Sequence, residues 1–225
     1  MSEGNRIIAS WHANADQWIA TIDHGEIESR ILVTNEAIVR TITSYPLVSV
    51  LDIGCGEGWL TRALHNKGLR ASGVDTVAAL IGNALEKGGG TYEVASFQDI
   101  ATGMYTVDKK FDAAVINFAL LDQTDTEALV KNIRRVVADN GLLFIQTLHP
   151  LVIARQEPYI SGWKEGSWNG MKREFVQPYP WYFRTLEDWI RLFTEAGLTL
   201  QQLAEPVHPE TQAPVSVIFV LQVSA

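Results

Sequence analysis

Three glycines alternate with other residues directly after an apolar run in the first third of the chain. The run ends at Ile53, and the glycines are Gly54, Gly56 and Gly58. Helical spacing follows, so the pattern predicts a strand, a tight turn and a helix. Glycine lets a ligand approach backbone N–H groups, and a helix start offers unpaired donors with positive partial charge. The junction predicts a site for a nucleotide-like cofactor, with a plain tight turn as the alternative.

A carboxylate follows at a spacing that suits such a site. Asp75 closes the next short apolar run and lies 21 residues after Gly54. In a doubly wound sheet, the acid after the second strand hydrogen-bonds the ribose hydroxyls of the cofactor. Asp75 could instead cap the helix expected over residues 77–87, and the two roles are compatible.

The glycine spacing separates two classes of cofactor. A dinucleotide fingerprint needs a small residue at position 59, where this chain has Trp59. The Gly-x-Gly-x-Gly run, preceded by Leu51-Asp52-Ile53, resembles the first motif of the class I S-adenosylmethionine-dependent methyltransferases. The resemblance extends from about Val48 to the C-terminus. It implies that the loop wraps the methionyl portion and the ribose of S-adenosylmethionine, with S-adenosylhomocysteine as the product.

The resemblance also implies the fold and the first cofactor contacts. The expected fold is α/β, with a Rossmann-like, doubly wound, seven-stranded sheet whose last strand is antiparallel. Helices would cover both faces as an α/β/α sandwich, and an N-terminal helical lid would cover the cofactor. The residues expected to contact the cofactor in this part of the chain are Asp52, Gly54, Cys55, Gly56, Asp75 and Thr76.

Residues 1–46 show helical periodicity and no strand-like run. They would form the lid as two helices, the second ending near Pro46. By the resemblance, Arg30 would pair with the methionyl carboxylate, although a solvated surface arginine is the alternative. Trp11 would close over the acceptor or lie in the core.

Two further segments of the resemblance add cofactor contacts. After a third strand over residues 91–95, Ser96 and Phe97 fall where the family reads adenine, with Phe97 as plain core the alternative. Relatives often carry an acid at position 96, so its absence leaves Gln98 or Asp99 as candidates for that role. The run 111–117 resembles the family's fourth strand and would place two residues beside the sulfonium, Asn117 and Phe118.

A helix over residues 126–138, an Asn140-Gly141 stop and a fifth strand over 142–148 are expected next. His149 then follows at the same sheet edge. It could remove a proton from an acceptor hydroxyl, because its reference pKa of about 6.5 suits a base at neutral pH. Alternatively, it hydrogen-bonds a strand end and fixes the loop.

Residues 149–184 hold eight of the 21 aromatic residues of the chain. This composition predicts a lid or small subdomain that lines an acceptor pocket, or else a satellite core under a long loop. The pocket candidates in this segment are Trp163, Trp168, Tyr179, Trp181 and Tyr182. Thr185 begins a helix with acids close behind, and strands over 198–203 and 215–221 would close the sheet as an antiparallel hairpin.

Composition limits the remaining possibilities. With 225 residues, the chain fits one domain: N-terminal helices (1–46), a cofactor-binding core (47–148), the aromatic insertion (149–184) and a C-terminal helix with closing hairpin (185–225). A net charge of −8 argues against a general nucleic-acid binder. The single Cys55 and the lack of a signal or membrane-spanning segment favour the cytoplasm. No metal is expected, and the oligomeric state is not predicted.

The sequence therefore predicts methyl transfer to a small, partly apolar or aromatic acceptor. O-methylation is slightly favoured because His149 offers a base. One alternative is a non-catalytic module that binds S-adenosylmethionine and uses the aromatic insertion as a protein interface. A nicotinamide-dependent oxidoreductase is the other alternative, and Trp59 argues against it.

Overall fold

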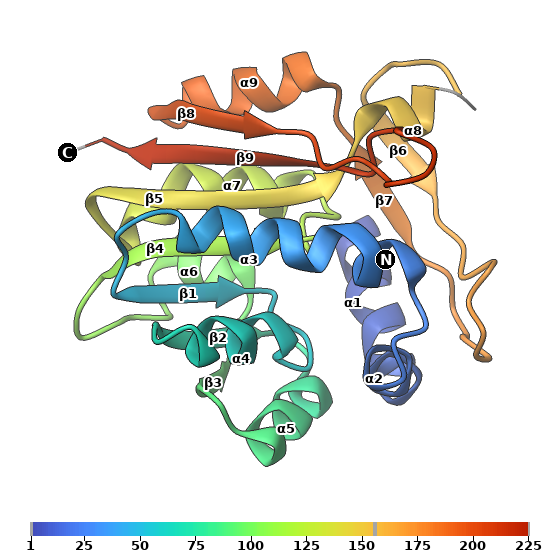
Figure 1. The fold of residues 1–225 in the computed structure, drawn as a ribbon, viewed down its shortest axis with the longest axis horizontal. Helices are drawn as coiled ribbons and strands as arrows, with labels where there is room; N and C mark the ends of the chain where they lie inside the picture. The colour runs from blue at the N-terminus through green and yellow to red at the C-terminus, as the bar shows by residue number, and fades with distance from the viewer. Residues whose placement is uncertain (1, 155–156, 225) are drawn as a thin grey trace.

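A seven-stranded mixed sheet forms the centre of the computed structural model, which describes residues 2–154 and 157–224 (Figure 1). The strand order is β3-β2-β1-β4-β5-β9-β8, and β9 runs antiparallel to both of its neighbours. This confirms the predicted Rossmann-like sheet and its antiparallel last strand. The strands are β1 (Ser49–Ile53), β2 (Arg70–Asp75), β3 (Thr91–Val94), β4 (Phe111–Asn117), β5 (Val137–Leu148), β8 (Leu198–Ala204) and β9 (Ser216–Val223).

Helices cover both faces of the sheet, as predicted. One face carries α3 (Asn35–Thr43), α4 (Trp59–Asn66) and α5 (Ala78–Lys87), and the other carries α6 (Phe97–Thr102), α7 (Thr124–Asn132) and α9 (Leu186–Glu195). The central strand β4 is apolar on both sides because successive side chains point to opposite faces. Ala113 and Val115 pack toward α3 and α4, whereas Ala114 and Ile116 pack toward α7 and α9.

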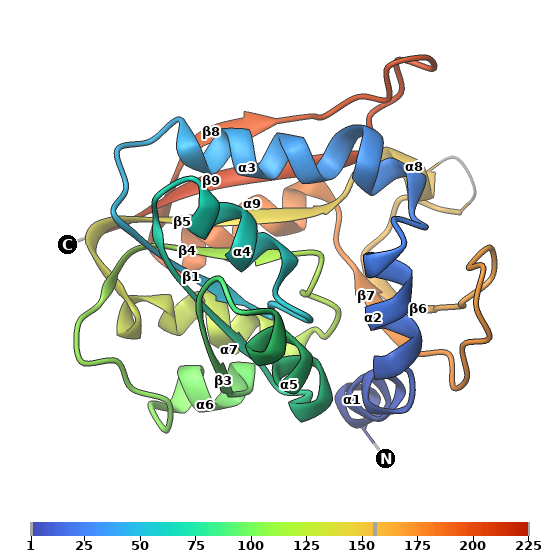
Figure 2. The same cartoon turned by 60° about the horizontal axis from the view of Figure 1, so that its bottom comes forward.

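A separate group of elements lies beyond the carboxyl ends of β1 and β4 (Figure 2). It consists of α1 (Glu3–Ala13), α2 (Ala15–Asp23) and an antiparallel hairpin of β6 (Gly162–Glu165) and β7 (Pro180–Phe183). We call α1, α2, the hairpin and the loop 166–179 that joins its strands the cap. A π-helical turn (Arg30–Thr34) leads into α3, and a short helix, α8 (Pro150–Ala154), follows β5.

The predicted helix over residues 126–138 is wrong at its C-terminal end. Helix α7 stops at Asn132, a 3-10 turn covers Ile133–Arg135, and β5 already begins at Val137. Asn140, with φ 62°, and Gly141 lie inside β5, where the pairing with β4 shifts register. The Asn-Gly pair therefore bends a strand, a use of positive φ that the sequence pattern does not distinguish from a helix stop.

The N-terminal helices also differ in detail from the prediction. The first expected helix is divided at Asn14 into α1 and α2, and the second begins with a π-helical turn.

None of the helices within residues 2–154 and 157–224 is long and apolar enough to cross a membrane.

Candidate functional site

The glycine loop after β1 has a backbone that only glycine suits. Gly54 has φ +75°, and a Cβ there would lie 2.5 Å from the Ala119 Cβ, which is a severe overlap. The N–H groups of Gly54 and Cys55 both donate to the Val74 carbonyl, at 2.8 and 3.0 Å. Strand β2 therefore holds the loop, and Ala119 approaches it from the segment that follows β4.

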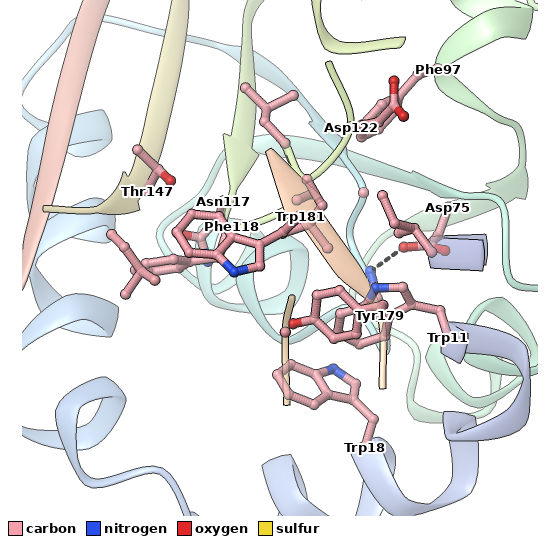
Figure 3. Close-up of a pocket in the computed structure, with 18 of the residues that line it drawn as sticks. Trp11, Trp18, Asp75, Phe97, Asn117, Phe118, Asp122, Thr147, Tyr179 and Trp181 are labelled. Atoms are coloured by element: carbon pink, nitrogen blue, oxygen red, sulfur yellow. Dashed lines mark hydrogen bonds between the residues drawn. The ribbon is translucent and has the colours of Figure 1, made fainter. Parts of the chain in front are cut away.

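Asp75 connects the end of β2 to this loop. Its Oδ2 accepts from the Gly56 N–H at 2.9 Å (the dashed line in Figure 3) and its Oδ1 accepts from the Val77 N–H at 2.9 Å. Burial raises the pKa of Asp75, while these two hydrogen bonds act in the opposite direction. The Oδ1 bond reaches only Val77, the residue before α5, and no side chain of the described residues caps α5, so the alternative role of Asp75 in capping that helix is wrong.

Asp52 lies beneath the loop and does not line the cavity, so its predicted contact with the cofactor is wrong. Its side chain is buried and its Oδ2 accepts from the Thr61 hydroxyl at 2.8 Å. Burial raises the pKa of Asp52 to about 7. Asp52 thus ties β1 to α4 and supports the loop from below.

A cavity of about 500 Å³ lies above the glycine loop at the carboxyl edge of the sheet. Asp75 and Phe97 lie along one side of it, Thr147 and Asn117 along the opposite side, and Trp11 and Trp18 lie below them in the view (Figure 3). Most predicted site residues meet here: Trp11, Arg30, Gly54, Cys55, Gly56, Asp75, Thr76, Ser96, Phe97, Asn117, Phe118, Tyr179, Trp181 and Tyr182. Burial raises the pKa of Cys55 well above its usual value, so its thiol stays protonated.

The Arg30 guanidinium lines the cavity and donates one long hydrogen bond among the described residues, from its Nε to the Asn35 Oδ1 at 3.4 Å. Its Nη2 atom is buried and has no hydrogen-bond partner among the described residues. The guanidinium lies 4.9 Å from the Trp59 ring centroid and 5.7 Å from that of Trp18. Burial lowers the pKa of Arg30 to about 10, with Glu57 acting in the opposite direction. The alternative of a solvated surface arginine is therefore wrong.

Two other buried polar atoms that line the cavity have no partner among the described residues. They are the Thr34 Oγ1 and the Asn117 Oδ1. Asn117 ends β4, and the next residue, Phe118, has φ 56°, which is unusual for a bulky side chain. Since unsatisfied buried polar atoms are rare, these positions indicate that the cavity is built for a polar ligand.

The polar side chains between β3 and the first turn of α6 are hydrogen-bonded to other groups of the protein. The Ser96 N–H and hydroxyl both donate to the Asp99 Oδ2, at 2.8 and 2.7 Å, and the Asp99 N–H donates back to the Ser96 Oγ. The Gln98 Nε2 donates to the Asp125 Oδ1 at 2.6 Å. Ser96 and Phe97 line the cavity, whereas neither Gln98 nor Asp99 does.

His149 does not reach the cavity, so its predicted role as the base is wrong. Its side chain is 1% exposed. The Leu151 N–H donates to its Nδ1 at 3.1 Å, which leaves the proton on Nε2 to donate to the Glu205 Oε1 at 2.7 Å. Both ring nitrogens are occupied, so His149 fixes the chain after β5, which was the alternative.

Two of the predicted pocket residues lie outside the cavity. Trp168 stacks on Phe175, with ring centroids 4.4 Å apart, and packs edge-on to Tyr179 at 5.0 Å, so it lies behind the cavity wall. Trp163 is 40% exposed and packs against Tyr182. The aromatic insertion is thus partly a pocket wall and partly the small core that was the alternative.

The cap closes over the cavity through contacts between segments far apart in the chain. The Val176 N–H donates to the Asn14 Oδ1 at 2.7 Å, and the Asn14 Nδ2 donates to the Val176 carbonyl. Arg173 forms an ion pair with Glu26 at 2.8 Å, and Trp11 packs against Trp168. The loop 166–179 is therefore held by α1, α2 and the residues after them.

Several residues of the site were missed by the sequence analysis. Trp18 covers the glycine loop, since a Cβ at Gly56 would lie 3.7 Å from its Nε1, and only its helical spacing hinted at this. Asp122 lies on the segment after Phe118, and no sequence signal points to it.

Within the described ranges, no group of three or more His, Cys, Asp or Glu side chains could hold a metal ion.

Comparisons with known proteins agree with this geometry. A family model described as a methyltransferase domain matches residues 25–203. An uncharacterized methyltransferase of Schizosaccharomyces pombe is 21% identical over 209 residues, which cover 86% of this chain and 75% of that protein. An S-adenosylmethionine-dependent methyltransferase from Mesorhizobium loti has a TM-score of 0.63 at 20% identity, covering 84% of this chain and 98% of that one. The glycopeptide N-methyltransferase MtfA, complexed with sinefungin, has a TM-score of 0.65 at 14% identity, covering 85% and 86%.

Proposed function

The chain belongs to the family of methyltransferase domains, and we propose that it transfers a methyl group from S-adenosylmethionine to a small acceptor in the cavity. The observation that carries this proposal is Arg30, whose buried Nη2 has no partner among the described residues. A buried cation next to the glycine loop suits the methionyl carboxylate, because a charge-assisted hydrogen bond compensates its burial. The nearby cavity-lining Thr34 Oγ1 would add a second polar contact.

Asp75 supports the other part of the cofactor site. Each of its oxygens accepts one backbone hydrogen bond, and a carboxylate has about four lone-pair sites. It can therefore also accept from the two ribose hydroxyls without releasing Gly56 or Val77. The glycine loop, Arg30 and Asp75 together fit an elongated ligand with an anion at one end and a diol near its centre.

In this proposal the protein contributes orientation and exclusion of water. When bound, S-adenosylmethionine supplies an electrophilic methyl group on a sulfonium. Asn117 and Phe118 end the central strand β4, so they can fix the position of the acceptor relative to that methyl group. Orientation of two reactants can lower a barrier by about 7–11 kcal/mol. The cap, through Trp11 and Trp18, would keep water out.

The acceptor would be partly apolar or aromatic. Tyr179, Trp181 and Tyr182 give the cap side of the cavity flat apolar faces, and the Asn117 Oδ1 is free to accept from an acceptor N–H or O–H. The preference for hydroxyl acceptors depended on His149 as a base, and it loses that support because His149 lies outside the cavity.

We place the activity in the cytoplasm, which the free thiol of Cys55 suits.

Calorimetric titration tests the cofactor assignment. We expect micromolar binding of S-adenosylmethionine and S-adenosylhomocysteine, and none of NADH or NADPH. Arg30→Met should weaken binding of both sulfur nucleotides by roughly 10- to 100-fold, because it removes a charge-assisted hydrogen bond. The exposed Arg40 on α3 gives the control Arg40→Met, which should bind like the wild type. Binding of a nicotinamide nucleotide instead would overturn the proposal.

A further inference from the structure

The adenine of the proposed cofactor needs a hydrogen-bond acceptor for its amino group. With the methionyl carboxylate at Arg30 and the ribose at Asp75, the base must extend past Asp75, away from Arg30. On that side of the cavity Phe97 and Asp122 lie together (Figure 3), and their sequence neighbours Ser96, Leu120, Leu121 and Asp125 also line the cavity. Phe97 can cover one face of the base, which leaves the question of what reads its edge.

The side chains of the loop after β3 are already occupied. The Ser96 hydroxyl both donates to and accepts from Asp99, so Ser96 and Asp99 satisfy each other. Gln98 and Asp99 do not line the cavity at all. The two residues that the sequence analysis considered for this role are therefore excluded by position.

Asp122 brings a carboxylate to the same end of the cavity from a different segment. Its Oδ1 accepts from the Asp125 N–H at 2.7 Å. Its Oδ2 accepts no side-chain or backbone hydrogen bond in the described chain and lies beside Gly4 of α1, 3.1 Å from where a Cβ at that glycine would stand. The Gln98 side chain bonds to Asp125, which connects this turn to the loop after β3. Figure 3 shows the Asp122 carboxylate on the side of the cavity that carries Phe97.

We propose that Asp122 accepts a hydrogen bond from the 6-amino group of adenine and so selects an adenine over a hypoxanthine cofactor. The inference rests on the proposed use of S-adenosylmethionine. A 6-oxo group would face the Asp122 Oδ2 with no proton to share, and two acceptors in contact repel each other. Burial raises the pKa of Asp122, while the positive charge of Arg184, whose Nη2 donates to the Gln123 carbonyl at 2.9 Å, acts in the opposite direction.

The replacement Asp122→Asn gives a directional test. The backbone N–H of Asp125 needs an oxygen, so the amide would keep its oxygen there and present its NH₂ group to the ligand. A donor in that place prefers the 6-oxo group. Asp122→Ser is the second variant, because a serine hydroxyl can still accept from Asp125 but is too short to reach the base.

The probes are S-adenosylhomocysteine and S-inosylhomocysteine, titrated calorimetrically against the full chain. We expect the wild type to prefer the adenine form by roughly 10- to 100-fold. Asp122→Ser should reduce this ratio to near one, and Asp122→Asn should bring it to one or invert it. Glu86→Gln, which removes an exposed carboxylate on α5 outside the cavity, should keep the wild-type ratio.

The outcomes separate this inference from the proposed function. A wild type that binds S-adenosylhomocysteine without a preference overturns the role of Asp122, and so does a preference that survives in both Asp122 variants. Loss of the preference in Asp125→Asn but not in Asp122→Ser would assign the recognition to Asp125 and also overturn it. A wild type that binds neither probe would overturn the proposed function itself.

Discussion

The floor and the cap of the cavity are built in opposite ways. The floor is the glycine loop with Asp75, and its contacts are backbone hydrogen bonds between neighbouring strands, such as those from Gly54 and Cys55 to Val74. The cap is held by contacts that side chains make to segments about 160 residues away, such as the hydrogen bonds of the Asn14 amide to the Val176 backbone. The floor therefore depends on a short sequence motif, whereas the cap depends on pairs of residues that no local pattern reveals.

The largest expected effect is at the floor, in Gly54→Ala. The new Cβ would overlap Ala119, and alanine disfavours the positive φ of this position. We expect the free energy of unfolding to fall by about 2–5 kcal/mol, and the binding of S-adenosylmethionine to be lost. Urea unfolding and calorimetry measure the two effects. If the variant bound the cofactor normally, the loop would not be the rigid floor described above.

The second prediction concerns Asp52, which supports the glycine loop from below and should make the free energy of unfolding depend on pH. Burial raises the pKa of Asp52 to about 7 in the folded chain, from 3.8. Asp52 therefore adds stability that is complete below pH 3.8 and is lost as the pH rises through about 7. Asp52→Asn keeps an acceptor for Thr61 without the ionisation.

Relative to Asp52→Asn, the wild type should lose about 3–4 kcal/mol of unfolding free energy between about pH 4 and pH 8. Urea titrations of both proteins across this range measure the difference. Asp112→Asn is the control at an accessible site, because hydrogen bonds to Val48 and Ser49 hold the pKa of Asp112 below its usual value. Parallel curves for the wild type and Asp52→Asn would contradict the assignment.

The smallest effect is expected in the cap, in Asn14→Ala. The change removes both hydrogen bonds to Val176, at a cost of about 1–3 kcal/mol in unfolding free energy. Cofactor affinity should change less than about threefold, because Asn14 does not line the cavity. Limited proteolysis should cut the loop 166–179 faster than in the wild type. A large loss of cofactor binding would show that the floor and the cap are not separable.

The sequence predicted the floor better than the cap for a physical reason. The glycine loop and Asp75 follow from steric and hydrogen-bonding needs that act over a few residues, and the sheet follows from apolar runs of the right length. Whether Trp168 faces the cavity or packs on Phe175 depends instead on the path of a long loop. The same limit applies to His149, which was expected near the acceptor but is satisfied by Glu205 from a distant segment.

Turn residues caused another kind of error. The Asn140-Gly141 pair predicts the end of a helix, but in the structure the positive φ of Asn140 serves a bend within β5. Asp122 was not considered because an isolated acid on a connecting segment carries no periodicity, although the structure places it in the cavity wall. Both cases concern residues whose role is decided by neighbours distant in sequence.

The amide of Asn14 pairs with Val176 through both a donor and an acceptor, as one peptide group pairs with another in a sheet. For protein engineering, this means that the cap, which would select the acceptor, is built from two segments that are far apart in the sequence. A chimera that received only the loop 166–179 from another methyltransferase would pair with Asn14 only where its backbone follows that of Val176, and would leave Glu26 without the partner that Arg173 provides. Transplanting residues 3–26 together with this loop would preserve those contacts, so grafts of both segments should fold where single-segment grafts fail.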